Sequence, residues 1–479
     1  MEKPEAEHVS NDERLEKHPT VEAFPQAARA EGGVVLTVDV PGESPLHLAK
    51  DGHTVLLPQP TDDPADPLNW PSWKKHAILL TIAWGAFCAD FTSAAGSATI
   101  IVQAMEWHES VNKINETNSI NVLMMALGGL LWVPMTSFIG RAPTLFWSNL
   151  LGLLFSIGTA LSPNFITFYA MRALTGFFIT SAQTISIAFI KDMFFFHERA
   201  RKIGLWALLY IASPFWGPLV GNFILGGTNS WENVFWVCVA VCGVDMILIV
   251  TFLDETWRYI QTLIKPPVFI ILVAYLLFFA WAIGINITTA ILFGTPREFG
   301  GYGYSYNAVG FLYFSPIVGI LLGEIFGHFF NDAIARRYAK KHHGVFEPEA
   351  RLNMIYISSV FMIIGLVVLG QALLHHVSVG AVIMGWGLHS FGIMTASVAV
   401  TAYVLDSYPT APAEVSGWSN FARAIGGFGV GYFQQPWGAK VGYGESFGTQ
   451  AGIVAAGVVL VAMVHRFGHS LRVKAGPVK

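Results

Sequence analysis

The chain of 479 residues is poor in charged side chains. Aspartate, glutamate, lysine and arginine make up 13% of it, whereas hydrophobic residues make up 53%. An average soluble protein has about 25% charged residues. So few charges leave too little polar surface to cover such an apolar chain in water. The composition therefore disfavours a soluble enzyme, a nucleic-acid-binding protein and a disordered scaffold, and it predicts a chain whose main part is surrounded by lipid.

Cysteine is scarce as well. Cys88, Cys238 and Cys242 are the three in the sequence, and all lie in apolar runs, which excludes a disulfide framework. Cys238 and Cys242 share a helix face, but they have no third ligand nearby in sequence, so we interpret them as packing residues rather than a metal pair. No Gly-x-x-x-x-Gly-Lys-Ser/Thr motif and no His/Cys cluster occurs. We therefore expect no ATP-driven activity, no metal and no cofactor.

The first 75 residues differ from the rest. They contain 14 acidic and 7 basic residues and 10 of the 24 prolines, with no long apolar run. We predict that residues 1–75 form a disordered acidic tail. No apolar segment follows Met1, so we expect no cleavable signal peptide, and the first apolar helix is expected to direct the chain to the membrane.

Long apolar runs dominate the remaining sequence. About 20 apolar residues cross a membrane as a helix, whereas a membrane β-strand needs about ten. Twelve runs of helical length are present, at 77–104, 118–139, 144–162, 165–190, 203–226, 231–253, 267–293, 306–330, 352–374, 377–404, 415–437 and 447–467. We predict an all-α membrane protein with six-helix bundles at 76–255 and 267–467, a short cytoplasmic linker at 256–266 and a cytoplasmic tail at 468–479.

The positive charges between the runs predict the orientation. If the N-terminus is cytoplasmic, 18 lysines and arginines lie near the spans on that side, in addition to five in the distal N-terminal tail, against Lys113, Arg297 and Lys440 outside. Positive residues favour the cytoplasm, so both termini are expected there. Asn115-Glu116-Thr117 then lies in the first outer loop, and we predict Asn115 as a glycosylation site. The second sequon, at Asn286, lies within an apolar helix and is not expected to be modified.

Three short motifs recur at places that suggest a family. They are Gly140-Arg141 after the second run, Arg172-Ala-Leu-Thr-Gly176 in the fourth and Gly217-Pro218-Leu-Val-Gly221 in the fifth. Gly327 and Asp332, after the eighth run, repeat the small-residue and loop pattern of the first half. With these motifs, residues 66–470 resemble the major facilitator superfamily of transporters. The resemblance implies two pseudo-repeated halves that move around a central site, with these residues serving conformational change.

Further segments resemble the fungal drug:proton antiporter-like branch of that superfamily. They are residues 66–74 before the first run, Leu253-Asp-Glu255-Thr256 after the sixth, and 344–352 before the ninth. The family pattern usually has an acidic residue where Ser137 stands and a basic residue where Ala142 stands. The linker between the halves is also shorter than in relatives.

Charged groups inside a bilayer are costly and usually functional. Five of them lie within the runs away from the run ends, and these are the candidates for proton coupling or substrate binding: Asp90, Arg172, Asp245, Glu324 and Arg423. Asp90 is either a proton or cation site or the structural partner of a basic residue. Arg172 is either a charge relay or a structural charge. Glu324, Asp245 and Arg423 have helix packing as the alternative role. Asn286 is a polar group at midplane depth and a candidate substrate contact.

The best interpretation is a proton-coupled secondary transporter that exports a small organic molecule, amphipathic or cationic, by alternating access. The chain is expected to act as a monomer in the cell membrane or an internal membrane such as the vacuolar one, with protons, lipid and its substrate as partners and no nucleic acid. The alternative is a proton-coupled importer of a nutrient or an organic cation such as a polyamine. A membrane sensor or a membrane-embedded enzyme fits less well, because no signalling domain and no nucleophile–base or metal constellation is visible. The aromatic residues Trp84, Phe87, Phe91, Trp281, Trp386 and Tyr403 are candidates to line an apolar cavity.

Overall fold

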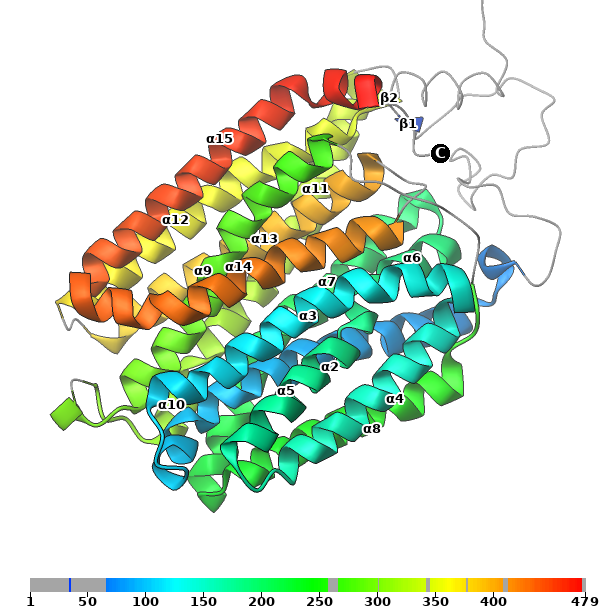
Figure 1. Ribbon diagram of the computed structural model, residues 1–479. Helices are drawn as coiled ribbons and strands as arrows, with labels where there is room; N and C mark the ends of the chain where they lie inside the picture. Colours follow the sequence, from blue (N-terminus) through cyan, green and yellow to red (C-terminus); the bar gives the residue numbers. More distant parts are fainter. Residues whose placement is uncertain are drawn as a thin grey trace, which may run out of the picture.

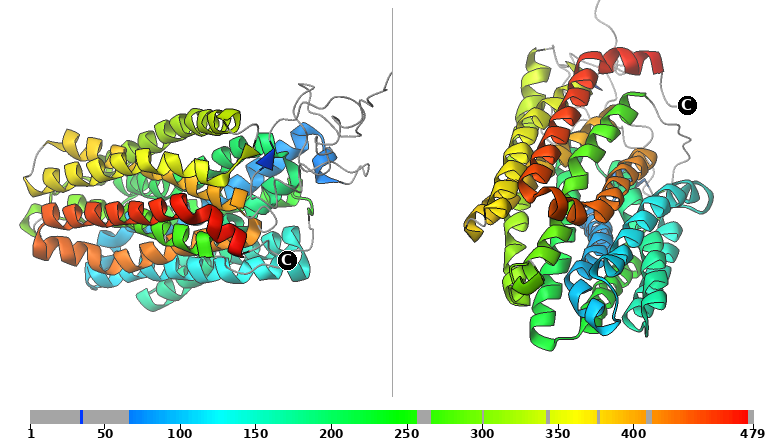
Figure 2. Two further views of the ribbon diagram at one scale, coloured as in Figure 1. Left: turned by 90° about the horizontal axis from the view of Figure 1, so that it is seen from above. Right: turned by 60° about the vertical axis from the view of Figure 1, so that its left-hand side comes forward.

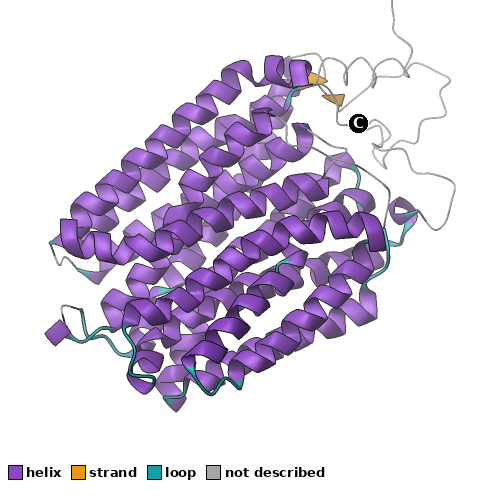
Figure 3. Cartoon of the chain, in the orientation of Figure 1, coloured by secondary structure: helices purple, strands orange, loops and turns teal. Residues whose placement is uncertain are grey.

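The computed structural model describes residues 34–35, 66–256, 266–299, 301–341, 345–375, 378–407 and 412–475. Within these ranges the chain is almost entirely helical, with short loops between long helices (Figure 3). The helices run side by side in one bundle, and the successive segments form two groups (Figure 1). The predicted all-α membrane fold is therefore confirmed.

The first group, called the N half below, runs from α2 to α8. Its elements are α2 (Ser72–Glu106), α3 (Val111–Ile139), α4 (Arg141–Ala160), α5 (Phe165–Ile179), α6 (Ser181–Met193), α7 (Phe196–Thr228) and α8 (Trp231–Phe252). Helices α5 and α6 follow one another across Thr180 and form one apolar unit, Phe165–Met193. The unit corresponds to the predicted fourth span.

The second group, called the C half, runs from α9 to α15. Its elements are α9 (Pro266–Gly294), η3 (Arg297–Phe299), α10 (Tyr306–Leu312), α11 (Phe314–Lys341), β2 (Val345–Phe346), η4 (Pro348–Leu352), α12 (Asn353–Leu374), α13 (Val379–Ser407), α14 (Pro412–Val441) and α15 (Tyr443–Ala475). The predicted linker 256–266 lies mostly in residues 257–265, outside the described part of the chain.

Ten helical units of the described chain are long and apolar enough to cross a membrane by length and composition. The two further long helices, α4 and α14, lie among them. Helix α4 packs against α5 and α8, and α14 packs against α9 of its own half and α3 of the other. Ten units together with these two helices are consistent with the twelve predicted spans.

The helices differ in how far the bundle shields them. The apolar part of α13 is 83% buried inside the bundle, whereas that of α8 is 39% buried. A helix that is apolar all round is stable in either place, because lipid and protein interior are both apolar. Polar groups are not stable in apolar surroundings, so a charged residue on an inner helix must find a partner within the bundle.

The two predicted tails are shorter than expected. Asp66 accepts a hydrogen bond from Leu68 N at 3.0 Å and so caps η2 (Pro67–Asn69), while Lys75 donates to the carbonyl oxygen of Leu68 at 2.8 Å. The last ten residues of the predicted tail are thus ordered. Residues 1–65 lie outside the described part except β1 (Val34–Val35), which pairs antiparallel with β2.

At the other terminus, α15 continues to Ala475, so the predicted tail from 468 is helical over most of its length. The start of α2 and the end of α15 lie at the same end of the bundle (Figures 1 and 2). That arrangement requires an even number of crossings between them, as the twelve-span interpretation does.

Candidate substrate and proton site between the halves

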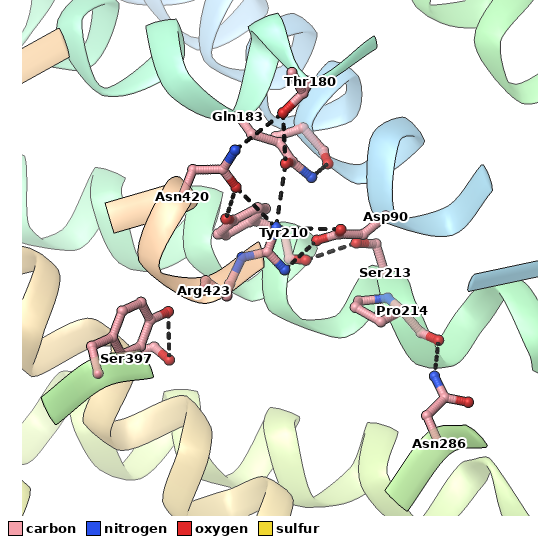
Figure 4. Close-up of polar contacts among 12 residues, drawn as sticks. Asp90, Thr180, Gln183, Tyr210, Ser213, Pro214, Asn286, Ser397, Asn420 and Arg423 are labelled. Atoms are coloured by element: carbon pink, nitrogen blue, oxygen red, sulfur yellow. Dashed lines mark hydrogen bonds and ion pairs between the residues drawn. The ribbon is translucent and has the colours of Figure 1, made fainter. Parts of the chain in front are cut away.

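An ion pair joins the two halves at the centre of the bundle. Asp90, from α2 of the N half, faces Arg423, from α14 of the C half (Figure 4). Nη1 of Arg423 lies 2.8 Å from Oδ2 of Asp90, and Nη2 lies 3.3 Å from Oδ1. Both side chains are buried. A buried charge is stable only when paired and hydrogen-bonded, and here each charge supplies the partner of the other.

Arg423 also has partners that do not depend on Asp90. Its Nη2 donates to Oδ1 of Asn420 at 3.0 Å and to Oε1 of Gln183 at 3.3 Å. Its guanidinium lies over the rings of Tyr210 and Phe279, at 4.5 and 4.9 Å from their centroids. Cation–π contacts are strongest away from water. The positive charge is therefore held by both halves, since Gln183 and Tyr210 belong to the N half.

The polar network continues from Arg423 into the N half. Tyr210 donates its hydroxyl to Oδ1 of Asn420 at 3.0 Å, and Nδ2 of Asn420 donates to Oγ1 of Thr180 at 3.1 Å (Figure 4). Thr180 marks the interruption between α5 and α6. Asn420 thus uses both ends of its amide to hold α14 against the N half.

A cavity of about 60 Å³ lies beside the ion pair, between the two halves. The N half contributes Asp90, Ser93, Ala94, Ser97, Asn118, Ser119, Val122, Met125 and Pro214; the C half contributes Ile283, Asn286, Ile287, Arg423, Ala424, Gly427 and Gly431. Most of the N-half wall is therefore polar, and most of the C-half wall is apolar. None of these described lining residues is aromatic, so the six aromatic candidates do not line this cavity.

Arg172 lies behind the polar wall and not at the ion pair. Its guanidinium donates to the backbone carbonyls of Thr92 and Ser93 at 2.8 and 2.7 Å and to Oδ1 of Asn118 at 2.8 Å. No carboxylate of the described residues pairs with it. The side chain is fully buried, so Arg172 holds two wall residues, Ser93 and Asn118, in place, while Arg423 pairs with Asp90.

The glycine of the Arg172 motif permits this arrangement. A Cβ on Gly176 would overlap the backbone carbonyl of Asn121 and lie 3.0 Å from its Nδ2. Asn121 in turn donates from Nδ2 to the carbonyl oxygen of Arg172 at 2.6 Å. Glycine is required because α3 and α5 approach each other so closely.

The sequence of this chain matches the model of the Major Facilitator Superfamily over residues 82–431. The chain belongs to the major facilitator superfamily. Its relatives include the efflux pump radE of Floropilus chiversii, 24% identical over 98% of this chain and 95% of that protein. The multidrug transporter TPO3 of Candida glabrata is 26% identical over 86% of this chain and 71% of that one. Polyamine transporter 3 of Saccharomyces cerevisiae is 26% identical over 77% of this chain and 64% of that one.

Solved major facilitator structures share the fold. The proton:xylose symporter XylE aligns with a TM-score of 0.64 at 14% identity, over 85% of this chain and all of that one. The human organic anion transporter MFSD10 aligns with a TM-score of 0.58 at 14% identity, over 82% of this chain and all of that one. At such identities the likeness concerns the fold alone.

The glycines of the fifth-span motif pack this major facilitator protein within one half. A Cβ on Gly217 would overlap the carbonyl oxygen of Phe91 and lie 2.8 Å from Ala95 N, and one on Gly221 would lie 3.0 Å from the Cβ of Ala98. All three neighbours belong to α2. Gly217 therefore permits close packing of α7 on α2 inside the N half rather than across the interface.

Pro218, next to Gly217, acts across the interface through a carbonyl that it leaves free. Proline has no N–H, so the carbonyl oxygen of Pro214 has no helical donor four residues later. Asn286 of α9 supplies that donor, with Nδ2 at 3.0 Å from the oxygen (Figure 4). Oδ1 of Asn286 accepts from the hydroxyl of Tyr313 at 2.8 Å. Asn286 does line the cavity, but its amide is already committed.

Two predicted carboxylates lie outside the cavity. Asp245 of α8 is buried against α2, where a Cβ on Gly85 would come within 3.0 Å of its Oδ1. Glu324 of α11 faces Gly204 of α7 across the interface between the halves, and its Oε2 is buried without a hydrogen-bond partner among the described residues. Neither touches the Asp90–Arg423 pair.

The loop motif Gly140-Arg141 joins three elements at the end of the bundle where α2 begins. Gly140 has a φ of +91°, a conformation that favours glycine, and α4 starts at the next residue. The carboxylate of Glu255 accepts from the backbone N–H groups of Arg141 and Ala142 at 3.1 and 3.0 Å. The Arg141 side chain pairs with Asp192 of α6. The first-half motif is thus a tertiary helix cap plus an ion pair.

The residues that correspond to this motif in the second half do not form such a cap. The nearest atom that a Cβ on Gly327 would meet is 3.9 Å away, so this glycine is not needed for close packing. The side chains of Asp332 and Ser137 lie outside the described part. The segment before α12 takes the bridging role instead, because Glu349 forms two hydrogen bonds with Arg472, at 2.8 and 2.7 Å. Arg351 of the same segment pairs with Asp406 of α13.

A further contact at this end lies within the N half and joins the start of α7 to the end of α6. Arg199, at the start of α7, donates to the carbonyl oxygens of Lys191 and Phe194 at 3.2 and 3.3 Å. Burial lowers the pKa of Arg199, and the nearby carboxylates of Asp406 and Asp192 partly offset that effect. Asp406 belongs to the C half, so its field reaches across the interface.

The predicted glycosylation at Asn115 does not fit this structure. Asn115 lies inside α3, not in a loop, and is 7% exposed. Its Nδ2, the atom that would carry a glycan, donates to the carbonyl oxygen of Gly431 in α14 at 3.0 Å. The sequon is therefore part of the contact between the halves.

Sequence reasoning missed most neutral polar residues of the site. Gln183, Tyr210 and Asn420 surround Arg423, and Asn118 and Ser119 line the cavity. One signal was available, because Asn420 precedes Arg423 by three residues and so shares its helix face. Uncharged polar residues are common in membrane helices, so spacing alone does not identify the remaining neutral residues as part of the site.

Proposed function

We propose that this major facilitator protein is a proton-coupled secondary transporter that exports a small organic molecule in exchange for protons. The single observation that carries the proposal is the Asp90–Arg423 ion pair, which spans the two halves beside the central cavity. In folds built from two repeated halves, the substrate site lies at their interface near the midplane. A carboxylate at that place can exchange its cationic partner for a proton.

The coupling step follows from the partners of each charge. A proton on Asp90 removes its negative charge and with it the attraction to Arg423. Arg423 keeps Asn420, Gln183 and two aromatic rings. Protonation therefore weakens the tie between α2 and α14 without expelling the arginine. The two halves can then separate on one side, which exposes the cavity and releases the proton there.

Orientation and location belong to the same proposal. The excess of lysine and arginine at the end where α2 begins supports a cytoplasmic location for both termini. The names of the relatives, among them an efflux pump and a multidrug transporter, support export and a role in transport rather than catalysis. We assign the protein to the cell membrane or an internal membrane, as a monomer in lipid.

The alternative is import of an organic cation. The name of one relative, polyamine transporter 3, supports this alternative. The two directions differ in a cellular measurement. An exporter expressed in a pump-deficient yeast lowers the accumulation of a toxic organic compound, whereas an importer raises the uptake of labelled spermidine. In both cases Asp90→Asn should abolish the effect, because it removes the titratable proton while keeping size.

The decisive experiment uses protein reconstituted in liposomes with an imposed pH gradient. We expect solute movement that requires the gradient, reverses when the gradient is reversed and is lost in Asp90→Asn. The matched control is Asp254→Asn, the same substitution at an exposed carboxylate that does not line the cavity. Wild-type transport by Asp90→Asn would refute Asp90 as the coupling residue.

A further inference from the structure

Two hydrogen-bond donors on the cavity wall have no partner among the described residues. They are Nδ2 of Asn118 and the hydroxyl of Ser119, both buried. Oδ1 of Asn118 accepts from Nη2 of Arg172 at 2.8 Å. That bond fixes the orientation of the amide, because only the oxygen can face a guanidinium. The N–H groups of Asn118 are therefore available to a ligand.

Several other polar groups of the wall are already engaged. Ser97 donates to the carbonyl oxygen of Ala94 at 2.8 Å, and both ends of the Asn286 amide have partners. Both oxygens of Asp90 face Arg423. The groups of Asn118 and Ser119 that lack a partner are mainly hydrogen-bond donors. Acceptor oxygens on a ligand would satisfy them best.

The charges around the cavity disfavour a cationic ligand. Arg423 and Arg172 carry positive charge, and Asp90 is the carboxylate among the described lining residues. An organic cation would find that carboxylate already paired and would meet the field of two guanidinium groups. An organic anion could reach Arg423 only by displacing Asp90, which would leave a buried carboxylate without a counter-charge.

The opposite wall sets the shape of the ligand. Ile283, Ile287 and Ala424 of the C half present carbon atoms to the cavity. A ligand with one oxygen-bearing edge and one carbon face would match both walls. An edge of acceptor oxygens would lie toward α3, and the carbon face would lie toward α9 and α14.

We propose that this site takes an uncharged, oxygen-rich small molecule whose carbonyl or hydroxyl oxygens accept hydrogen bonds from Asn118 and Ser119. The proposal rests on the proposed function for the location of the site, and it names the substrate class. It agrees with the amphipathic molecule expected from the sequence and differs from the cationic one and from a polyamine. A neutral substrate is also compatible with proton exchange, because its binding adds no charge and the charge of the site then changes only when Asp90 gains or loses a proton.

The test compares three probes with one skeleton: the acetyl, carboxylate and aminoethyl derivatives of catechol, which are neutral, anionic and cationic at pH 6. Binding to the purified full-length protein in detergent is measured by calorimetry. We expect the neutral acetyl derivative to bind about tenfold more tightly than either charged probe, which corresponds to roughly one strong interaction. Tighter binding of a charged probe, or no binding of the neutral one, would overturn the proposal.

A pair of serine variants tests the assigned donor. Ser119→Ala should weaken binding of the neutral probe about fivefold, the effect of one hydrogen bond. Its thermal stability should not fall, because the hydroxyl has no partner to lose. Ser156→Ala is the matched control, since its hydroxyl is also buried without a partner but lies in α4 away from the cavity. Unchanged binding in Ser119→Ala would remove Ser119 from the site.

These outcomes are separable from the proposed function. Binding is measured without a pH gradient, so a preference for the neutral probe stands even if Asp90→Asn leaves transport intact. Conversely, gradient-driven transport that depends on Asp90 together with tighter binding of the cationic probe would keep the coupling mechanism and refute the substrate class.

Discussion

Nδ2 of Asn286 lies 3.0 Å from the carbonyl oxygen of Pro214, and this hydrogen bond crosses from the C half to the N half. The oxygen is free because Pro218, four residues later, has no N–H to donate. A proline in one half thus creates an acceptor that the other half uses. Such an acceptor is costly to leave unsatisfied in a dry interior, which makes the contact a specific tie between α7 and α9.

That relationship predicts a coupling between two substitutions. Asn286→Ala should destabilise the protein by about 1 kcal/mol or more, because the Pro214 oxygen loses its donor. In a Pro218→Ala background, the new backbone N–H can satisfy that oxygen, so Asn286→Ala should cost less. Thermal unfolding of the four proteins in detergent gives the coupling energy, expected at about 1 kcal/mol. The lost contact with Tyr313 occurs in both backgrounds and cancels. Additive effects would show that Pro218 does not govern this carbonyl.

The ion pair of the site should respond unequally to loss of either partner. Asp90→Asn leaves Arg423 without its counter-charge, but Asn420, Gln183 and two rings remain, so we expect a loss smaller than the ~3–5 kcal/mol usual for a broken buried pair. Arg423→Gln leaves the Asp90 carboxylate buried without its counter-charge, which costs about 3–5 kcal/mol. Unfolding midpoints followed by tryptophan fluorescence at pH 7 measure both. A larger loss in Asp90→Asn would contradict the described role of the network around Arg423.

Gly217 should be required for assembly of the N half. Gly217→Val places a branched side chain where even a Cβ overlaps the Phe91 carbonyl, and we expect a loss of about 3 kcal/mol, because backbone cannot yield as a side chain can. The measurement is the yield of monodisperse protein by size-exclusion chromatography. Gly227→Val in the same helix is the control, since a Cβ there meets no atom within 4 Å. Equal yields of the two variants would disprove the packing role.

Two adjacent acidic residues should differ in their effect on stability. Glu255 accepts from two backbone N–H groups at the start of α4, a helix with no side-chain cap of its own. Glu255→Ala should therefore cost about 1 kcal/mol, as for loss of a helix cap. Asp254 pairs with Lys74 at an exposed position, where an ion pair contributes about 0–1 kcal/mol. Thermal unfolding of both alanine variants tests the order, and a larger effect at Asp254 would refute the capping role.

The sequence predicts the architecture well because membrane spans obey a strong length rule. Apolar runs near 20 residues identify the helices, and the cost of charged and polar groups in lipid marks Asp90, Arg423 and Asn286 as exceptions on three different spans. These three do line one cavity. The motif around Arg172 and Gly176 is also visible in the sequence, although its role as a support for Asn118 is not.

Which charged residues form an ion pair, by contrast, depends on which sides of the helices lie against one another. Asp90 and Arg423 are 333 residues apart, and nothing local distinguishes Arg423 from Arg172 as the partner of Asp90. The family motif favoured Arg172 as a relay, whereas the position of α14 at the interface selects Arg423. The same reason explains Gly217, whose side of α7 faces α2 and not the other half.

The sequence by itself determined the helical membrane fold, the places of its charged residues and its superfamily motifs, because hydrophobic length and the cost of buried charge act on each span separately. The tertiary structure alone decided that Asp90 pairs with Arg423, that Asn115 is buried against Gly431, and that Asn118 and Ser119 keep donors without a partner in the described part of the chain. Each of these depends on the rotation and approach of two helices, and many different packings of twelve apolar helices satisfy the same one-dimensional pattern.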